Sequence, residues 1–156
     1  ARDFLRFVEG TEISRVLLLV AESRLHEGWP LMNENDLLAK LSVKQKTQLI
    51  PYMRERTIPR ERLLFRRGDR VRCLYLIKEG QVRLVRDEGL ETRGYRGSLV
   101  GRVRADGEKH TVSAITEATT VVYVISMSDL QTFFRDNPGT YVRFLAAERG
   151  QITETL

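Results

Sequence analysis

A chain of 156 residues with 42% hydrophobic and 30% charged side chains is long enough for one globular domain with a packed core, and its composition excludes a disordered tail. Its longest apolar run, residues 16–21, is far shorter than the roughly 18–20 residues that span a bilayer, so no membrane span is expected. The net charge of +5 comes from arginine, with 21 arginines against 5 lysines, and it favours acidic partners.

The chain holds few side chains suited to metal or redox chemistry. The single cysteine, Cys73, cannot form an internal disulfide, which fits a reducing, cytoplasmic location. The two histidines, His26 and His110, lie too far apart for a zinc spacing. No Ser/His/Asp set, loop pair of carboxylates or P-loop occurs. We therefore expect no catalytic residue, no metal site, no cofactor and no enzyme activity.

The first 36 residues predict a helical segment and a connector. Apolar side chains recur at three- and four-residue spacing between Phe4 and Ala21, which is typical of one face of a helix. Residues 26–36 contain Pro30 and two asparagines, which break that period. This stretch is expected to be a connector.

Two short helices are expected next. Asn35 is a candidate cap for a helix over residues 36–41. Ser42 and Gln45 have the spacing of a capping box at the start of a helix over residues 43–53. Pro51 lies late in that helix and is expected to end or bend it.

From Thr57 onward the hydrophobic period changes to two. Short β-rich runs alternate with turns rich in Gly, Asp and Glu, and they occupy residues 62–69, 72–89, 90–95, 109–115 and 119–126. Several short, evenly spaced strands are typical of an antiparallel sandwich or barrel.

Helix signals return at Ser126, which has Asp129 three residues later, and a final helix is expected to begin at Pro138. The final helix carries an apolar stripe. That stripe either pairs with a second chain or covers the β-rich region, and its residues are Tyr141, Phe144, Leu145 and Ile152.

Spaced motifs in this chain resemble the cyclic-nucleotide-binding domain family. In the front half, residues 37–85, Phe65 precedes a Gly68–Asp69 turn, and "LYLIKEGQVRL" holds a Glu79–Gly80 turn. Residues 111–139 resemble the back half. The family includes catabolite-activator-type transcription factors, regulatory subunits of protein kinases and gating domains of ion channels.

The resemblance covers residues 37–156 and implies an α+β fold. Its centre would be an antiparallel, jelly-roll-like β-roll of about eight strands over about residues 57–126, flanked by N-terminal helices. Two C-terminal helices over about residues 127–156 would close it. Residues 1–36, the N-terminal helical segment and connector, lie outside the resemblance.

The family keeps a phosphate-binding loop in the region of residues 97–114. A short helical turn there offers N–H groups to the cyclic phosphate, an arginine neutralises it, and a glutamate accepts the ribose hydroxyl. Aligning Gly101 puts Arg102 in the glutamate position, and aligning the strand at residues 110–116 puts Glu108 in the arginine position. Both charges are inverted, and the loop is about three residues too short for the helical turn. The resemblance thus implies that ordinary binding of cyclic AMP or cyclic GMP has been lost.

The same region predicts a β-hairpin in place of a phosphate loop. Asp106–Gly107 is a strong signal for a two-residue turn, and it would pair Val103 with His110 and Gly101 with Val112. Alternate residues would then share one inward face, namely Leu99, Gly101, Val103, Val112 and Ala114.

The hairpin can also be interpreted as a site for a different anionic nucleotide. In the expected register Arg104 lies opposite Lys109, and a bound acidic group would relieve their repulsion. The alternative is an exposed arm with hydrated charges. The candidate ligand-binding residues are Gly101, Arg102, Arg104, Lys109, His110 and Thr111.

A dense basic segment precedes the hairpin. Its arginines lie near turns and are suited to an acidic protein or to nucleic acid, and they are Arg60, Arg62, Arg66, Arg67, Arg70 and Arg72. No aromatic stacking platform or nucleic-acid motif accompanies them, so nucleic acid is the third-ranked partner.

The leading hypothesis is a non-catalytic regulatory or protein-interaction module in a longer protein or assembly. The partner would be another protein, the rest of a longer chain, or a second copy bound through the C-terminal helix. The main alternative is a sensor that binds a cyclic or other anionic nucleotide in a non-standard way.

Overall fold

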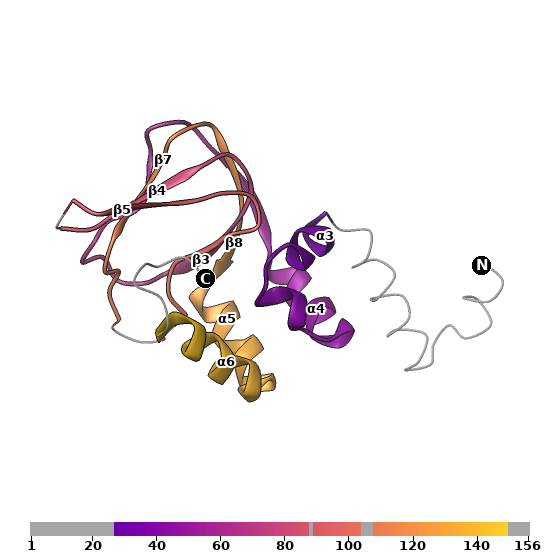
Figure 1. Ribbon diagram of the computed structural model, residues 1–156. Coiled ribbons are helices and arrows are strands. Elements are labelled where there is room, and N and C mark those ends of the chain that lie inside the picture. The colour runs from indigo at the N-terminus through magenta and orange to yellow at the C-terminus, as the bar shows by residue number, and fades with distance from the viewer. Residues whose placement is uncertain (1–26, 88, 104–107, 150–156) are drawn as a thin grey trace, which may run out of the picture.

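The computed structural model describes residues 27–87, 89–103 and 108–149, which form a β-roll and a group of helices packed against one end of it (Figure 1). The helix expected over residues 4–21 lies outside the described residues. The helices, with η marking short 3-10 helices, are α3 (Gly28–Asn33), η1 (Leu38–Lys40), α4 (Val43–Leu49), η2 (Ile50–Tyr52), α5 (Met127–Asp136) and α6 (Pro138–Arg149).

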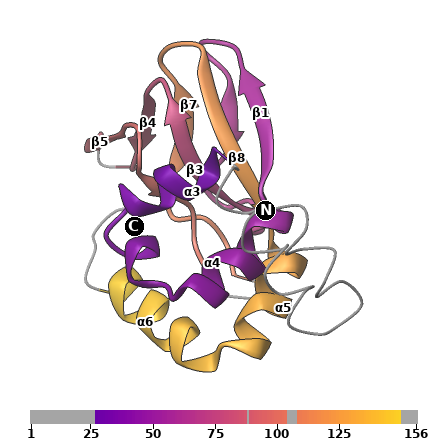
Figure 2. The ribbon, with the colours of Figure 1, turned by 90° about the vertical axis from the view of Figure 1, so that its right-hand side faces the viewer.

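The described strands form two four-stranded antiparallel sheets with the orders β1-β8-β3-β6 and β2-β7-β4-β5. Figure 2 shows the strands standing above the helices. This arrangement confirms the expected α+β fold and its β-roll. The strands are β1 (Arg54–Ile58), β2 (Leu63–Phe65), β3 (Cys73–Glu79), β4 (Val82–Val85), β5 (Glu91–Gly94), β6 (Leu99–Val100), β7 (Ser113–Thr116) and β8 (Thr120–Ser126).

Two hydrophobic cores lie on opposite faces of the first sheet. Successive side chains of a strand point to opposite faces, so β3 contributes to both cores. Leu74 and Leu76 belong to the core shared with the helices, whereas Ile77 belongs to the core between the two sheets. The second core also takes Phe65 from β2. The β-roll is therefore packed inside and is also anchored to the helices.

The helical core is built around phenylalanines of the two C-terminal helices. Phe133 and Phe144 are each 2% exposed, and the ring of Phe134 meets that of Phe144 edge-on at 5.3 Å. A polar network joins the α5–α6 corner to α4, because Gln45 Nε2 donates to the side-chain oxygens of Asn137 and Thr140. Helix α4 is thus fixed to the corner between α5 and α6.

The expected helix boundaries are largely confirmed. Ser42 and Gln45 form the capping box of α4, and the Ser126 hydroxyl accepts the N–H of Asp129 at the start of α5. Asn35 Oδ1 accepts the N–H groups of Leu37 and Leu38 as expected of a capping residue, but the helix expected over residues 36–41 is only the 3-10 helix η1 over Leu38–Lys40. The α4 helix ends at Leu49, and Pro51 lies in the 3-10 turn η2 that follows it.

The expected connector over residues 26–36 was wrong in its middle, because residues 28–33 form helix α3. Pro30 is its third residue, where the missing N–H has no intrahelical partner to lose. Leu31 and Met32 are both fully buried and hold the helix against the core.

Strand β1 was missed, because its sequence Arg-Glu-Arg-Thr-Ile has no apolar alternation and four of its five side chains are exposed. It is nevertheless paired along its whole length with β8. Backbone pairing at a sheet edge does not need an apolar face, so the side chains gave no signal.

The expected pairing of the 99–103 and 110–114 segments was also wrong. β6 pairs with β3 at Tyr75 and Leu76, while β7 lies between β2 and β4 in the other sheet. Both edges of β7 are occupied, so it has no edge left for β6. Leu99, Gly101, Val103, Val112 and Ala114 are all buried as expected, but they do not share one face. Leu99 and Val103 belong to the core shared with the helices, whereas Val112 and Ala114 belong to the core between the two sheets. The Asp106–Gly107 turn lies outside the described residues.

Candidate functional site

Arg102 is held by a carboxylate from the C-terminal helix. Its Nε donates to Oε1 of Glu148 in α6 at 2.8 Å, and Oε2 of Glu148 accepts the backbone N–H of Val103 at 3.1 Å. The side chains of Arg102 and Glu148 are only 16% and 8% exposed. Burial strengthens such charge-assisted bonds. We call this arrangement the Arg102–Glu148 latch.

The latch also connects to the start of the segment that leads into β7. The Arg102 guanidinium donates to the backbone carbonyl of Lys109 at 2.9 Å and lies 3.6 Å from the carboxylate of Glu108. Arg102 therefore faces two acidic groups and a carbonyl oxygen of its own chain. An external anion would have to displace Glu148 before it could use this guanidinium.

Gly101 serves the backbone conformation at this position. Its φ is +125°, in the left-handed region that favours glycine. A Cβ here would lie 3.3 Å from the carbonyl oxygen of Cys73 on the neighbouring strand. The residue lets β6 end close against β3 and direct Arg102 to α6.

His110 is a packed aromatic residue. It is 4% exposed, and its ring lies parallel to that of Phe65, with centroids 3.6 Å apart. Its backbone N–H donates to Asp69, and its carbonyl accepts from Gly68, both at 2.9 Å. The Gly68–Asp69 turn that helped identify the resemblance is thus bonded to the segment that leads into β7.

The remaining candidate ligand residues do not converge on Arg102. Lys109 and Thr111 are exposed and line an open hollow of about 480 Å³ with Arg67 and Glu108. Arg104 lies outside the described residues. Of the described candidates, Lys109, His110 and Thr111 line this same hollow, whereas Arg102 does not line it and bonds to α6.

A separate cavity of about 370 Å³ opens beside Phe65, and we call it the Phe65 cavity. Leu64, Phe65, Tyr75 and His110 line one part of it, and its polar lining comes from Asp69, Arg70, Arg72 and Cys73. The rings of Phe65 and Tyr75 are stacked at 6.1 Å. The cavity thus combines aromatic side chains with two arginines and one carboxylate, that of Asp69.

Two titratable groups on β3 line the Phe65 cavity, and both stay neutral at ordinary pH. Burial raises the pKa of Tyr75 from 10.0 to about 12, although nearby Arg56 lowers it. Burial also raises the pKa of the Cys73 thiol, against the opposing effect of Arg56. The arginines of this region therefore face no thiolate or phenolate at neutral pH.

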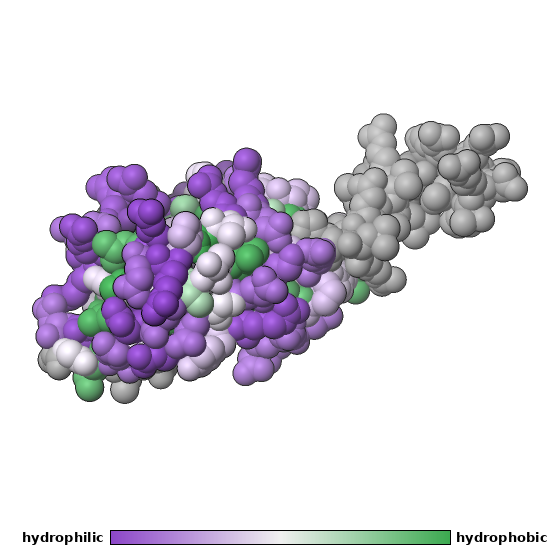
Figure 3. Space-filling view, turned by 90° about the horizontal axis from the view of Figure 1, so that it is seen from above, coloured by the Kyte–Doolittle hydropathy of each residue, from purple (hydrophilic) through white to green (hydrophobic). Residues whose placement is uncertain are grey.

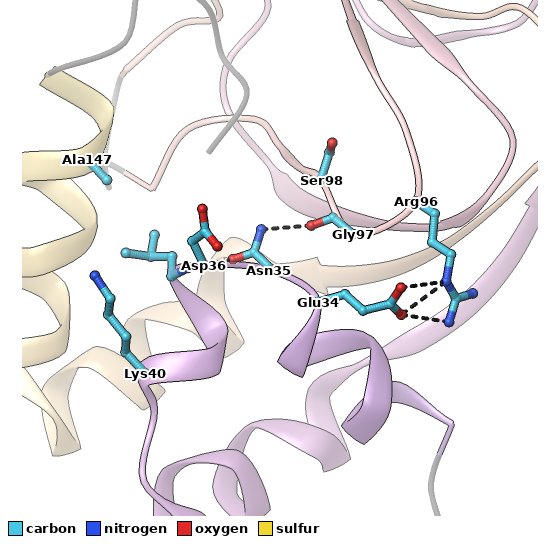
Figure 4. A pocket seen from close by; sticks show the side chains of 9 residues that line it. Glu34, Asn35, Asp36, Lys40, Arg96, Gly97, Ser98 and Ala147 are labelled. Atoms are coloured by element: carbon cyan, nitrogen blue, oxygen red, sulfur yellow. Dashed lines mark hydrogen bonds and ion pairs between the residues drawn. The ribbon is translucent and has the colours of Figure 1, made fainter.

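A second cavity, of about 410 Å³, lies where the N-terminal helices, the β5–β6 turn and α6 meet (Figure 4). Asn35 is 4% exposed, and its amide donates to the carbonyl of Gly97 at 2.8 Å. Arg96 beside it donates to both carboxylate oxygens of Glu34, at 3.1 and 3.0 Å. The polar groups drawn toward each other in Figure 4 thus fasten α3 and η1 to the roll.

The apolar stripe of the final helix covers the molecule's own core. Phe144 is 2% exposed, Tyr141 and Leu145 pack against the helical core, and the ring of Tyr141 lies 5.0 Å from that of Phe134. The sequence left open whether this stripe pairs with a second chain or covers the domain itself, and in the structure it covers the domain's helical core. Ile152 lies outside the described residues.

Glu148 and Arg56 are the residues that the sequence analysis missed. Glu148 is one acid in the last turns of a helix, and no local motif marks it as the partner of a residue 46 positions earlier. Arg56 lies in the missed strand β1. Only the packing of α6 against the roll and of β1 against β8 brings them into these sites.

Within residues 27–87, 89–103 and 108–149, no three His, Cys, Asp or Glu side chains are grouped so as to hold a metal ion. None of the helices described there has the length and apolar character needed to cross a bilayer.

The family model of the cyclic nucleotide-binding domain matches residues 55–137. Among curated proteins, the chain is 26% identical over 148 residues to the cGMP-dependent 3',5'-cGMP phosphodiesterase A of Dictyostelium discoideum. That match covers 92% of this chain and 17% of the relative's length, so the chain spans only a small part of that protein.

Solved structures show the same fold. The N-terminal domain of a transcriptional regulator from Streptomyces coelicolor A3(2) has a TM-score of 0.61 and 26% identity, over 76% of this chain and 87% of that one. The regulatory subunit of a cAMP-independent protein kinase A from Trypanosoma brucei has a TM-score of 0.68 and 18% identity, over 81% of this chain and 47% of that one. The second likeness concerns the fold alone.

Proposed function

Because this chain belongs to the cyclic nucleotide-binding domain family, we propose that it is a non-catalytic regulatory module that has lost ordinary binding of cyclic AMP and cyclic GMP. It acts through contacts with another protein or with other parts of a longer chain. The Dictyostelium relative, of which this chain spans 17%, is an example of such a longer protein.

The Arg102–Glu148 latch carries this proposal. The position of the family's phosphate-binding arginine holds Glu108, and an anion that bound at Arg102 instead would need the guanidinium and backbone N–H that Glu148 already uses. The Glu148 carboxylate thus occupies hydrogen-bond donors that an external anion would use. Glu108, 3.6 Å from the same guanidinium, adds a second negative charge that a phosphate would meet.

The energetic consequence is large on the scale of ligand binding. Losing one charge-assisted hydrogen bond costs about 1.5–3 kcal/mol. Each 1.4 kcal/mol is about a factor of ten in affinity, so a site of micromolar affinity becomes roughly millimolar once two such contacts are lost.

The latch also gives the module a means of regulation. It ties the end of β6 to the last turns of α6, so a partner that competes for Glu148 would release α6 from the roll. Regulation would then depend on the position of α6.

Isothermal titration calorimetry with cyclic AMP, cyclic GMP and cyclic dinucleotides tests the loss of binding. We expect no heat of binding at ligand concentrations up to about 100 μM, which lies well below a millimolar dissociation constant. Micromolar binding of cyclic AMP or cyclic GMP that is weakened by Arg102→Ala and unchanged by Arg135→Ala on exposed α5 would contradict the proposal.

A further inference from the structure

Four arginines around the Phe65 cavity make no ion pair with a carboxylate of the described residues, whereas several other arginines of this chain do. Arg67, Arg93, Arg96 and Arg102 are each paired with an acidic side chain. Arg54, Arg56, Arg70 and Arg72 are exposed, and none of them makes an ion pair with any residue in the described ranges. We call these four residues the arginine rim.

Strand register places the β1 half of the rim beside the cavity. Arg54 lies opposite Val124 of β8, and Val124 lies opposite Tyr75 of β3, so the three side chains form one row on one sheet face. Arg56 is close enough to lower the pKa of both Cys73 and Tyr75, against the stronger opposite effect of burial. Arg70 and Arg72 line the cavity directly.

The spacing within the rim is that of an extended chain. Arg54 and Arg56 are two residues apart on a strand, so their side chains emerge from one face about 7 Å apart. Arg70 and Arg72 flank Val71, which is 7% exposed, so they also alternate with a buried residue. Carboxylates at every second position of an extended peptide have the same spacing.

The strands next to the cavity can accept such a chain. β1 and β2 are the outer strands of their sheets, and each has one edge free of ladder pairing among the described strands. Extended peptides bind proteins by lying along such edges, with alternate side chains entering pockets. Hydrophilic side chains cover most of the face seen in Figure 3, with apolar patches among them.

We propose that the arginine rim and the Phe65 cavity together bind an acidic, extended segment of a partner protein. The cavity takes one apolar side chain of that segment, and the rim pairs with carboxylates at alternate positions on either side. The inference rests on the proposed role as a protein-interaction module and names the chemistry of its partner.

The cavity favours a peptide over nucleic acid. A base needs an open aromatic face on which to stack. One face of Phe65 is covered by His110 at 3.6 Å, and Tyr75 is half-buried. Arginines that pair with phosphates would bind nucleic acid through charge alone, and the apolar side chains of the cavity would have no part in it.

Fluorescence polarisation with a labelled peptide tests the proposal. The probe has nine residues, with glutamate at its first, third, seventh and ninth positions, leucine at its fifth and threonine between them. We expect it to bind with a dissociation constant on the order of micromolar. Replacing the leucine by serine should weaken binding about tenfold, since burial of an apolar side chain favours binding and part of that gain is lost in ordering the chain.

Two double variants with the same charge change separate the rim from general electrostatics. Arg70→Glu/Arg72→Glu should weaken peptide binding by about 30-fold or more, because two charge-assisted contacts become repulsive. Lys44→Glu/Arg135→Glu, both on exposed helix positions, should change it less than about threefold, since screened distant charges contribute little. Equal losses in the two variants, or no binding of the acidic peptide, would overturn the inference.

Single-stranded DNA of matched charge is the competing probe. If it binds more tightly than the peptide and the leucine-to-serine change has no effect, the rim is a nucleic-acid surface and the inference fails. The two proposals fail separately. Micromolar binding of a cyclic nucleotide contradicts the proposed function, whereas absence of both cyclic-nucleotide and peptide binding contradicts only this inference.

Discussion

Two settings of arginine divide the molecule. On the helical side, Arg102 and Arg96 are held by Glu148 and Glu34, and they join the roll to α6 and α3. Around the Phe65 cavity, the four arginines of the arginine rim are exposed and make no ion pair within the part of the chain that the structure describes. The residue type is the same, and the neighbours differ.

The difference separates charges that stabilise the fold from charges that the fold does not use. A charge pair that is mostly buried leaves an uncompensated charge when one member is removed, so its loss is costly. An exposed arginine without a partner contributes little to stability, because water solvates it in both the folded and the unfolded chain. Stability and binding measurements should therefore separate the two groups.

The largest effect is expected at the latch. The Glu148 side chain is only 8% exposed, and Arg102→Ala leaves its carboxylate without a cation. This change should lower the free energy of unfolding by about 2–4 kcal/mol. Arg72→Ala on the rim is the matched control and should change it by less than about 0.5 kcal/mol. Urea denaturation at pH 7 measures both. Equal midpoints for Arg102→Ala and the unmodified chain would remove the distinction between the two settings.

A double-mutant cycle identifies the partner of Arg102. Arg102→Ala/Glu148→Ala should cost less than the sum of the single changes by about 1–3 kcal/mol, since each single change strands the other charge. Additive costs would mean that the two side chains do not depend on each other.

A smaller loss of stability is expected at Asn35, an uncharged residue whose side chain bonds the helices to the roll. Asn35→Ala removes the bond to Gly97 and the cap on Leu37 and Leu38, and should cost about 2 kcal/mol because the freed backbone groups are buried or partly buried. Ser42→Ala removes an exposed cap and should cost about 1 kcal/mol. Thermal unfolding of the two variants compares them, and equal losses would show that the link to the roll adds nothing to the cap.

The smallest effect lies at the cavity and appears only at high pH. The folded-state pKa of Tyr75 is raised to about 12 from 10.0 by burial, so the chain holds this proton more tightly when folded. The resulting stability is complete below pH 10 and is lost as the pH rises toward 12. Between pH 9 and 11 the unmodified chain should lose about 1 kcal/mol more than Tyr75→Phe. Parallel losses in urea denaturation at the two pH values would contradict a buried phenol here.

Local sequence signals predicted a large share of the fold. The capping residues Ser42, Asn35 and Ser126 each marked a helix start, because a cap bonds only to N–H groups two or three residues away. The period-two runs located most strands in the same way. Strand β1 and helix α3 were not predicted. Pairing with β8 stabilises β1 and burial of Leu31 and Met32 stabilises α3, although neither sequence has the usual pattern of its element.

The candidate site was predicted only in part. The inverted charges at Arg102 and Glu108 and the basic segment containing Arg70 and Arg72 were visible as residue types at positions in a known motif. The partner of Arg102 was not, because Glu148 lies 46 positions later in the chain and no local pattern connects the two.

The sequence alone determined the fold class, through motifs that resemble a known family, and several helix starts, since capping bonds are short-range. It also determined that Leu99, Val103, Val112 and Ala114 are buried, because they are apolar residues at alternate positions. Tertiary structure decided that β6 and β7 belong to different sheets, and it decided which arginines have partners. The physical reason is that strand pairing and ion pairing depend on which surfaces meet after the chain has packed, and no local period records that.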